Sequence, residues 1–296
     1  MNNDDLKVID NIKNLGIDMI NEAGSGHPGI VLGAAPIMYT LFSKHLNIST
    51  TDEKWINRDR FVMSAGHGSA LLYATLFMAG FNISIEDLKA FRKLNSRTPG
   101  HPEYGVTPGV EVSTGPLGQG FASAVGMAMA ERYYATKYNM KKKSMFESDL
   151  SLFDYYTYVL CGDGDLMEGI SYEAASLAGN LKLGKLIVLY DSNSVSLDGA
   201  TNKTFTENVL ARFNAMGWHT QLVKKGEDIR SIDKAITRAK SVVDKPSIIE
   251  IKTIIGKGSL EQGTNKVHGA PLSKEDLDQL KQKLGIRNIP FAVSKD

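Results

Sequence analysis

The sequence predicts an α/β protein with an open, mostly parallel β-sheet and helices on both faces of that sheet. Apolar, strand-like segments alternate with helical segments, especially in the second half of the chain. The strand-like segments are apolar along most of their length, which is typical of parallel strands buried on both faces. The strands are expected at residues 156–161, 186–190, 218–223 and 248–253.

Helical segments fill the gaps between these strands. The expected helices cover residues 168–181, 206–216 and 228–240. Strand, helix and strand repeated in this order form right-handed crossovers, so the helices would cover both faces of the sheet.

Further helices are expected earlier in the chain. Leu6, Ile9 and Ile12 begin an apolar stripe at helical spacing, which Gly24 can end. Ser84 and Asp87 fit a capping box that would open a helix through Leu94.

Residues 115–130 carry unusually small side chains. A helix of such residues can approach another backbone closely, so it is expected in a tight core or a subunit contact. The charged segment 141–151 is expected to be a solvated loop. A capping box at residues 273–276 precedes the C-terminal segment.

The composition argues against several classes of partner. The 34 Lys and Arg residues nearly balance 33 Asp and Glu, so the chain has no bulk attraction to nucleic acid or anionic membranes. The single cysteine, Cys161, excludes an internal disulfide and fits a core thiol in a reducing compartment. With an acidic first segment and no apolar run of about 18 residues, we expect a soluble, cytoplasmic protein.

Two oxygen-bearing residues follow successive predicted strands. Asp163 lies between Gly162 and Gly164, and Asn193 follows the next strand. In parallel sheets, ligands bind beyond the carboxyl ends of the strands. A carboxylate, an amide oxygen and a backbone carbonyl near Val195 would provide half of the ligands of a Mg²⁺ ion. Gly162 and Gly164 allow the backbone to approach a phosphate closely, and the N–H groups at the start of the following helix would point toward that phosphate. Each motif alone fits a turn or a cap; together they favour a metal–diphosphate site.

Four of the six histidines are next to glycine, which indicates loops that a ligand can approach. They are His27, His67, His101 and His268. Each one alone fits a hydrogen-bonded loop histidine equally well. If the four converge, they suit proton transfer near neutral pH or hydrogen bonds to a polyhydroxy substrate. The other two, His45 and His219, fall within helix or strand patterns and are expected to be structural.

A glycine-rich segment at residues 113–120 matches neither a dinucleotide fingerprint nor a P-loop. Gly115, Pro116 and Leu117 can present backbone groups and one apolar side chain to a flat ring. The same residues also fit an ordinary turn before the small-residue helix.

Taken together, these motifs resemble the transketolase family, in the family's order and over roughly residues 20–270. The Gly-Asp-Gly and Asn pair is shared by many thiamine-diphosphate enzymes, whereas the blocks at 98–103 and 114–120 are narrower and point to transketolase. The matching blocks are residues 25–29, 64–69, 98–103, 114–120, 162–169, 191–195 and 263–269.

The resemblance implies a thiamine-diphosphate-binding fold, with a diphosphate-binding domain at residues 1–285 and a tail at 286–296. It implies that a divalent cation (Mg²⁺, Ca²⁺ or Mn²⁺) is held by Asp163, Asn193 and the Val195 carbonyl. It also implies a set of residues that bind the cofactor or lie beside it, in which Glu168 matches a glutamate at the contact between the two halves of the enzyme. That set is His67, Gly115, Pro116, Leu117, Gly164, Glu168, Asn193 and His268.

The resemblance also assigns catalytic and substrate roles. His27, His101 and His268 would bind donor sugar hydroxyls and assist proton transfer, and Arg92 would reach the substrate phosphate. By itself, Arg92 fits an exposed helix cation equally well.

Transketolase chains normally continue into a pyrimidine-binding domain, and this sequence stops before it. The expected arrangement is therefore a split transketolase of the pentose phosphate pathway, in which a C-terminal subunit completes a heterotetramer that transfers a two-carbon ketol unit between sugar phosphates. Two alternatives remain. One is a subunit of another thiamine-diphosphate enzyme, resembling deoxyxylulose-phosphate synthase or a 2-oxoacid dehydrogenase; the other is a noncatalytic binding protein of the same fold.

Overall fold

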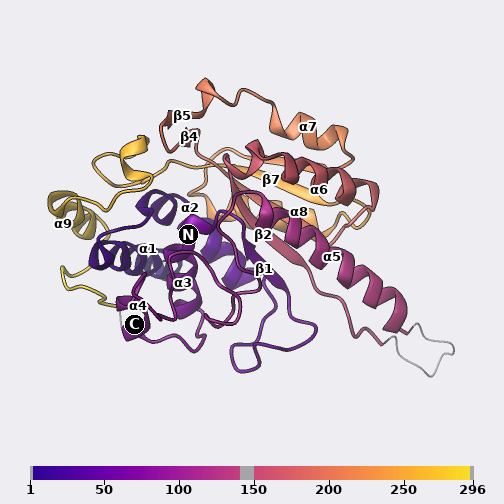
Figure 1. Cartoon of the computed structure of the whole chain (residues 1–296), viewed down its shortest axis with the longest axis horizontal. Helices are drawn as coiled ribbons and strands as arrows, with labels where there is room; N and C mark the ends of the chain where they lie inside the picture. The colour runs from indigo at the N-terminus through magenta and orange to yellow at the C-terminus, as the bar shows by residue number, and fades with distance from the viewer. Residues whose placement is uncertain (1–2, 141–149, 294–296) are drawn as a thin grey trace.

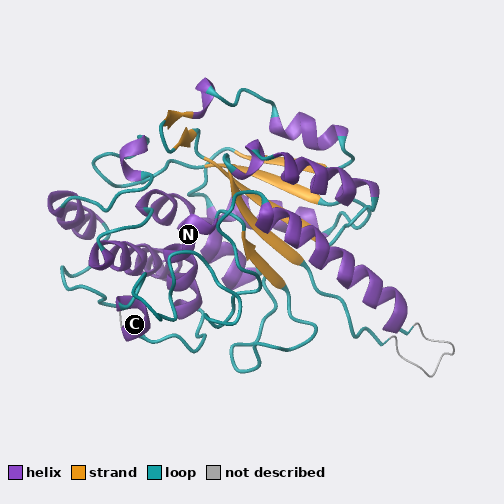
Figure 2. Ribbon diagram, in the orientation of Figure 1, coloured by secondary structure: helices purple, strands orange, loops and turns teal. Residues whose placement is uncertain are grey.

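A five-stranded parallel sheet runs through the centre of the molecule, with helices packed on both of its faces (Figures 1 and 2). The computed structural model describes residues 3–140 and 150–293. Every neighbouring pair of strands in this sheet is parallel, as predicted. In spatial order the strands are β1 (Arg60–Met63), β2 (Thr157–Gly162), β3 (Leu186–Ser192), β7 (Ser247–Lys252) and β6 (His219–Val223).

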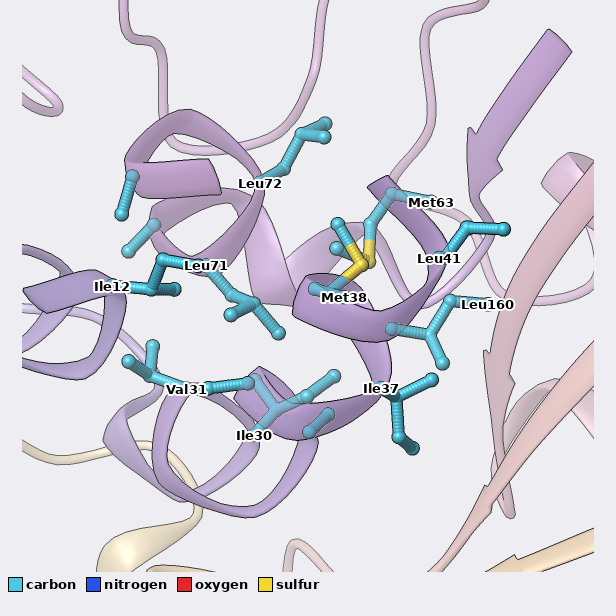
Figure 3. Packing of buried hydrophobic residues seen from close by; sticks show 14 of the residues in the cluster. Ile12, Ile30, Val31, Ile37, Met38, Leu41, Met63, Leu71, Leu72 and Leu160 are labelled. Atoms are coloured by element: carbon cyan, nitrogen blue, oxygen red, sulfur yellow. The ribbon is translucent and has the colours of Figure 1, made fainter. Parts of the chain in front are cut away.

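One hydrophobic core lies under a first layer of helices. Alternate residues of the strands, such as Tyr158 and Leu160 of β2, face this layer. Figure 3 shows Ile12, Val31 and Leu71 meeting where three of these helices cross. The helices of this layer are α1 (Asn3–Ala23), α2 (Pro28–Lys44), α3 (Ser69–Met78) and α8 (Ile229–Lys240).

A second core lies on the opposite face of the sheet. Val159 and Cys161, the other residues of the alternation in β2, face it. Cys161 is a fully buried free thiol, as predicted, and burial raises its pKa. The helices here are α5 (Gln119–Tyr138), α6 (Gly169–Asn180) and α7 (Val209–Ala215).

The remaining described elements are two further helices, an antiparallel strand pair and short 3-10 turns. None of the described helices is both long enough and apolar enough to cross a membrane. The additional elements are the helices α4 (Ile85–Lys89) and α9 (Lys274–Lys283), the antiparallel pair β4 (Val195–Ser196) and β5 (Gly199–Ala200), and short 3-10 turns at Gly66–Gly68, Asp165–Met167, Thr201–Lys203 and Asn265–Val267.

Several predicted helix boundaries were wrong. The helix opened by Ser84 has both bonds of the capping box, but it ends at Lys89 instead of Leu94. Beyond it, Arg92 has φ 62° and its N–H donates to the Thr98 carbonyl at 3.0 Å, a tertiary bond that takes the chain out of the helix.

The small-residue helix begins at Gln119, not at residue 115, because Gly118 has a left-handed backbone (φ 79°) that a helix cannot contain. It also continues past residue 130 to Tyr138. The helix predicted at 206–216 begins at Val209, where the Asn208 side chain caps it by accepting from the Ala211 N–H.

Most of the predicted loop 141–151 lies outside the described residues, although Met140 and Leu150 at its ends form an antiparallel bridge.

Candidate active site

The predicted metal ligands lie at the carboxyl edge of the sheet, where β2 and β3 end side by side. The register pairs Gly162 of β2 with Asp191 of β3, so the residues that follow each strand are neighbours. The loop after β3 turns sharply at Ser194 (φ 62°) and leads into β4. Asp163 and Asn193 are thereby brought to one place from positions 30 residues apart.

Asp163 offers an oxygen that the protein does not use. Its side chain is 7% exposed, and its Oδ1 accepts a hydrogen bond of 2.6 Å from the Tyr190 hydroxyl. Its Oδ2 is buried and has no hydrogen-bond partner in the described part of the chain. Burial raises the pKa of Asp163, while the Tyr190 hydroxyl and the backbone N–H groups of Asn193 and Ser194 act in the opposite direction. A buried, unpaired carboxylate oxygen fits a cation ligand.

Asn193 is held by its neighbours in one orientation. Its Nδ2 donates to Asp191 Oδ2 at 3.3 Å, and its Oδ1 accepts from the Val195 N–H at 3.0 Å. The second lone pair of that amide oxygen stays available to a metal. Asp191 is 2% exposed, and burial raises its pKa to about 6. Its second oxygen accepts from the Thr253 hydroxyl.

The chemistry of this ligand set fits a hard cation. No group of three or more His, Cys, Asp or Glu residues within residues 3–140 and 150–293 is arranged to hold a metal. The predicted set contributes one carboxylate together with amide and backbone carbonyl oxygens. Mg²⁺ is commonly held by few protein oxygens, with phosphate and water completing its shell.

Three of the glycine-flanked histidines touch one another. The ring centroids of His27 and His67 are 5.0 Å apart, those of His67 and His268 are 5.4 Å apart, and those of His27 and His268 are 5.8 Å apart. Burial, and then the charges of the neighbouring histidines, lower the pKa of His67 to about 3. Burial, followed by His268, Arg92 and His101, lowers that of His27 to about 4. Both imidazoles are therefore neutral at pH 7, with one donor and one acceptor nitrogen each.

Two buried nitrogens in this cluster have no partner within the described residues. They are Nδ1 of His27 and Nδ1 of His268. Buried polar atoms are nearly always hydrogen-bonded, so such a pair indicates a place where a ligand supplies the missing partner.

His101 and Arg92 lie beside the cluster. The His101 ring lies against Gly115, where an added Cβ would be 3.6 Å from two ring atoms. Arg92 Nη1 donates to the Ser25 hydroxyl at 3.5 Å, and both Arg92 and His101 contribute to the low pKa of His27. Arg92 is half-buried outside any helix, so it is not the exposed helix cation of the alternative interpretation.

The segment with Gly115, Pro116 and Leu117 faces this site as an exposed loop. An added Cβ on Gly66 would lie 2.8 Å from the Gly115 nitrogen, so the loop packs directly on the turn that carries His67. Pro116 and Leu117 are exposed, and Leu117 lies over Gly164, where an added Cβ would be 3.0 Å from its Cδ1. The loop therefore lies against both the turn that carries His67 and Gly164.

Glu168 is exposed at the N-terminus of α6, where its side chain makes no capping bond. It lies beside Gly118, at the rim of the site. His45 and His219 lie elsewhere, bonded to Asp233 at 2.8 Å and to Ser247 at 3.0 Å, as expected of structural histidines.

Sequence reasoning missed two groups that shape the site. Tyr190 supports Asp163 from the end of β3, and Asp165 is a fully buried carboxylate two residues beyond Asp163. The sequence did contain a signal for Asp165. It is the second acidic residue in the run Gly-Asp-Gly-Asp, which directly follows a strand that is predicted to be buried. A polar cavity of about 390 Å³ also opens beside Asp163, lined in part by Tyr190, Ser192 and Lys252.

Comparison with known proteins identifies a family that the chain matches. The family described as "Transketolase, thiamine diphosphate binding domain" matches residues 4–296. The transketolase of Bacillus subtilis (strain 168) is 56% identical over 271 residues, which is 91% of this chain and 40% of that protein. The chain thus spans about two-fifths of the length of the curated relatives that it matches.

Solved transketolases share the fold. The structure from Leishmania mexicana has a TM-score of 0.94 at 49% identity and covers 98% of this chain and 43% of its own. A Pichia stipitis transketolase, solved in complex with sedoheptulose-7-phosphate, has a TM-score of 0.92 at 50% identity over 98% of this chain and 42% of its own.

Proposed function

Since the chain belongs to the transketolase family and matches its thiamine-diphosphate-binding domain, we propose that it forms the diphosphate-binding part of an enzyme that transfers a two-carbon ketol unit from a ketose to an aldose. The observation that carries the proposal is the buried Oδ2 of Asp163, which has no hydrogen-bond partner among the described residues and lies near Asn193 at the carboxyl ends of β2 and β3.

The proposed cofactor site has three parts. Asp163, Asn193 and the Val195 carbonyl hold the divalent cation, for which Mg²⁺ is the first candidate and Ca²⁺ or Mn²⁺ the alternatives. The diphosphate lies against His67, His268 and Gly164, within reach of the N-terminus of α6 and of Glu168 at its rim. Gly115, Pro116 and Leu117 line the pyrimidine side. Bound thiamine diphosphate supplies the carbanion chemistry, for which this chain provides position and electrostatics.

The histidines are suited to a sugar substrate. A neutral imidazole donates at one nitrogen and accepts at the other, so it can bind a sugar hydroxyl and take or return its proton. We assign this role to His27, His101 and His268, since the first and last have unpaired nitrogens in the described structure. Arg92 carries the positive charge next to them and binds a substrate phosphate.

A phosphorylated substrate is supported by a relative. The Pichia stipitis enzyme that this chain resembles was solved with sedoheptulose-7-phosphate. We therefore place the reaction among sugar phosphates of the pentose phosphate pathway. A cytoplasmic location remains a prediction from the cysteine content.

The thiamine-diphosphate-binding domain accounts for only part of the length of the curated relatives. Residues 4–296 match the thiamine-diphosphate-binding domain, which we assign to residues 1–285 with a tail at 286–296, and the curated relatives are more than twice as long. We propose a C-terminal subunit with the pyrimidine-binding domain as the partner, and a heterotetramer as the complete assembly.

The test is reconstitution. This chain, its C-terminal partner, thiamine diphosphate and Mg²⁺ are mixed, and ketol transfer from a ketose phosphate to an aldose phosphate is followed by product analysis. Transfer is expected in the full mixture and not when either chain is omitted. No transfer in any mixture contradicts the proposal, and turnover of pyruvate instead favours the synthase or dehydrogenase alternative.

A calorimetric control separates the noncatalytic alternative. Titration of the assembled chains with thiamine diphosphate, with and without Mg²⁺, is expected to show metal-dependent binding. Absence of such binding together with absence of transfer would favour a protein that keeps the fold without the activity.

A further inference from the structure

Asp165 is a buried carboxylate that joins three separate segments at the edge of the cofactor site. Its side chain is 0% exposed. Its Oδ1 accepts from the Ser64 hydroxyl at 2.6 Å and from the Gly118 N–H at 2.9 Å. Its Oδ2 accepts from the Gly162 N–H at 3.0 Å. Two oxygens thus receive three hydrogen bonds.

The three donors come from parts of the chain that are far apart in sequence. Ser64 follows β1, Gly118 precedes α5, and Gly162 ends β2. Close packing brings them together, since an added Cβ on Gly120 would lie 2.6 Å from the Ser64 Cα. Ser64 Oγ also accepts from the Phe121 N–H at 2.9 Å, which ties the start of α5 into the same network.

Two of these donors, Gly162 and Gly118, are next in sequence to residues of the proposed cofactor site. Gly162 precedes Asp163, the proposed metal ligand. Gly118 follows Leu117, whose side chain lies over Gly164. The Asp165 carboxylate therefore links the loop that would hold the metal with the loop that would line the pyrimidine ring.

We propose that Asp165 is a positioning residue, which fixes the 115–118 loop relative to the metal-binding oxygen of Asp163 so that both ends of thiamine diphosphate are held at once. This inference rests on the proposed cofactor site. It adds a residue that touches neither the metal nor the cofactor and acts through Gly118 and Gly162.

The substitution Asp165→Asn tests this role, because it keeps the shape of the side chain and changes one acceptor into a donor. In Asp165→Asn, one oxygen becomes an NH₂ group. If that group replaces Oδ2, it faces the Gly162 N–H; if it replaces Oδ1, it faces the Gly118 N–H. Either orientation sets a donor against a donor, so at least one of the two loops loses its attachment.

A matched control exists at the other end of the strands, just before β1 begins. Asp59 is also a buried carboxylate (4% exposed), and it accepts from the backbone N–H groups of Asn47 at 2.9 Å and Tyr156 at 2.7 Å. Asp59→Asn therefore disturbs the same kind of bond near the start of β1, away from the proposed site. A purely structural role for Asp165 predicts that the two variants behave alike.

The first measurement is backbone hydrogen exchange in the 296-residue chain without ligands. Asp165→Asn is expected to speed exchange at residue 118, at residue 162 or at both by about tenfold or more, the effect of losing about 1.4 kcal/mol of local stability. Asp59→Asn is expected to speed it at residues 47 and 156 instead. Unchanged exchange at 118 and 162 in Asp165→Asn overturns the inference, whatever the cofactor results show.

The second measurement compares two ligands by calorimetry on the assembled chains with Mg²⁺. Asp165→Asn is expected to weaken thiamine diphosphate binding by about tenfold or more, and to weaken inorganic pyrophosphate binding several-fold less, because only the thiamine ring uses the 115–118 loop. Asp59→Asn is expected to bind both ligands as the unchanged chain does. Equal losses for the two ligands, or equal losses in the two variants, overturn the inference.

If Asp165→Asn does not fold, Ser64→Ala tests the same inference. It removes one donor and keeps the carboxylate, so a smaller preferential loss of thiamine diphosphate binding is expected, about threefold. No preferential loss in Ser64→Ala counts against the inference. If the unchanged chain binds neither ligand, the proposed function fails, and the exchange experiment still tests the link between the loops.

Discussion

Lys281 of α9 and Asp18 of α1 form a salt bridge of 2.6 Å in which both side chains are 3% exposed. The other oxygen of Asp18 accepts from the Phe291 N–H at 2.8 Å, so one carboxylate anchors both α9 and the segment that follows it. α9 in turn contacts the segment that leads to His268, since Asp276 Oδ1 accepts from the Leu260 N–H at 2.9 Å. Contacts between residues far apart in the chain therefore tie α9 to α1 and to the segment that precedes His268.

Removing one partner of this pair is expected to cost more stability than removing a surface charge. Lys281→Met leaves Asp18 buried and uncompensated, so the free energy of unfolding should fall by about 3–5 kcal/mol. Chemical denaturation measures it. Lys283→Met, which removes an exposed ammonium on the same helix, should cost less than about 1 kcal/mol. The double variant Asp18→Asn, Lys281→Met should be more stable than Lys281→Met alone; equal stability would contradict this account.

Two glycines of α5 should respond oppositely to the same substitution. Gly120→Ala places a Cβ 2.6 Å from the Ser64 Cα, a backbone atom that cannot give way, and is expected to lower the free energy of unfolding by about 2 kcal/mol or more. Gly126→Ala meets nothing within 4 Å and should leave stability unchanged or raise it by up to about 1 kcal/mol. Thermal and denaturant unfolding measure both. Similar effects in the two variants would show that the contact at Ser64 is not close.

The Asp163 oxygen that has no partner in residues 3–140 and 150–293 leads to a prediction about metal binding. Asp163→Asn replaces a carboxylate that would bind the cation with a neutral amide, and the Mg²⁺-dependent affinity for thiamine diphosphate should fall by about 100-fold or more, since even indirect partners of metal sites are worth about 10–100-fold. Calorimetry at several Mg²⁺ concentrations measures this. Asp198→Asn, at an exposed position in the adjacent turn, is the control and should bind as the unchanged chain does. Equal affinity in both variants would rule out Asp163 as a ligand.

The low pKa of His67 makes stability depend on pH. Its pKa is about 3 in the folded chain and about 6.5 when unfolded, so between these values the unfolded chain binds more protons. The stability that neutral His67 contributes is fully present above pH 6.5 and is lost as the pH falls toward 3. Asp191 acts in the opposite sense in part of this range, because its folded pKa is raised to about 6.

Comparison with a variant isolates the histidine, since the contribution of Asp191 cancels. The stability difference between the unchanged chain and His67→Gln should shift by about 2–3 kcal/mol in favour of the variant between pH 7.5 and pH 4.5. Urea denaturation at each pH measures it. A difference that stays constant over this range would contradict the assignment of a depressed pKa to His67.

The sequence pattern located the buried strands well and the short ones poorly. β2 and β3 have six and seven residues with apolar, buried centres, and the sequence predicts them almost to their ends. β1 has only four residues and follows Arg58 and Asp59, so no apolar run marks it. α2 was also missed, because it is buried nearly all round and shows no polar stripe.

Local rules failed where distant contacts decide the backbone. The capping box at Ser84 was read correctly, but the end of that helix depends on the bond between Arg92 and the Thr98 carbonyl. Nothing in the helical pattern encodes such a partner.

The sequence by itself determined the alternation of strands and helices, hence the parallel sheet, and the motifs that carry the family resemblance. It also put Asp163 and Asn193 after neighbouring strands, because the ends of parallel strands share one edge. Only the tertiary structure decided which histidines touch, which carboxylate oxygen is left unpaired, and that Asp165 joins two loops. The reason is physical: these properties depend on distance, burial and competing partners among residues far apart in the chain, and a local pattern specifies none of the three.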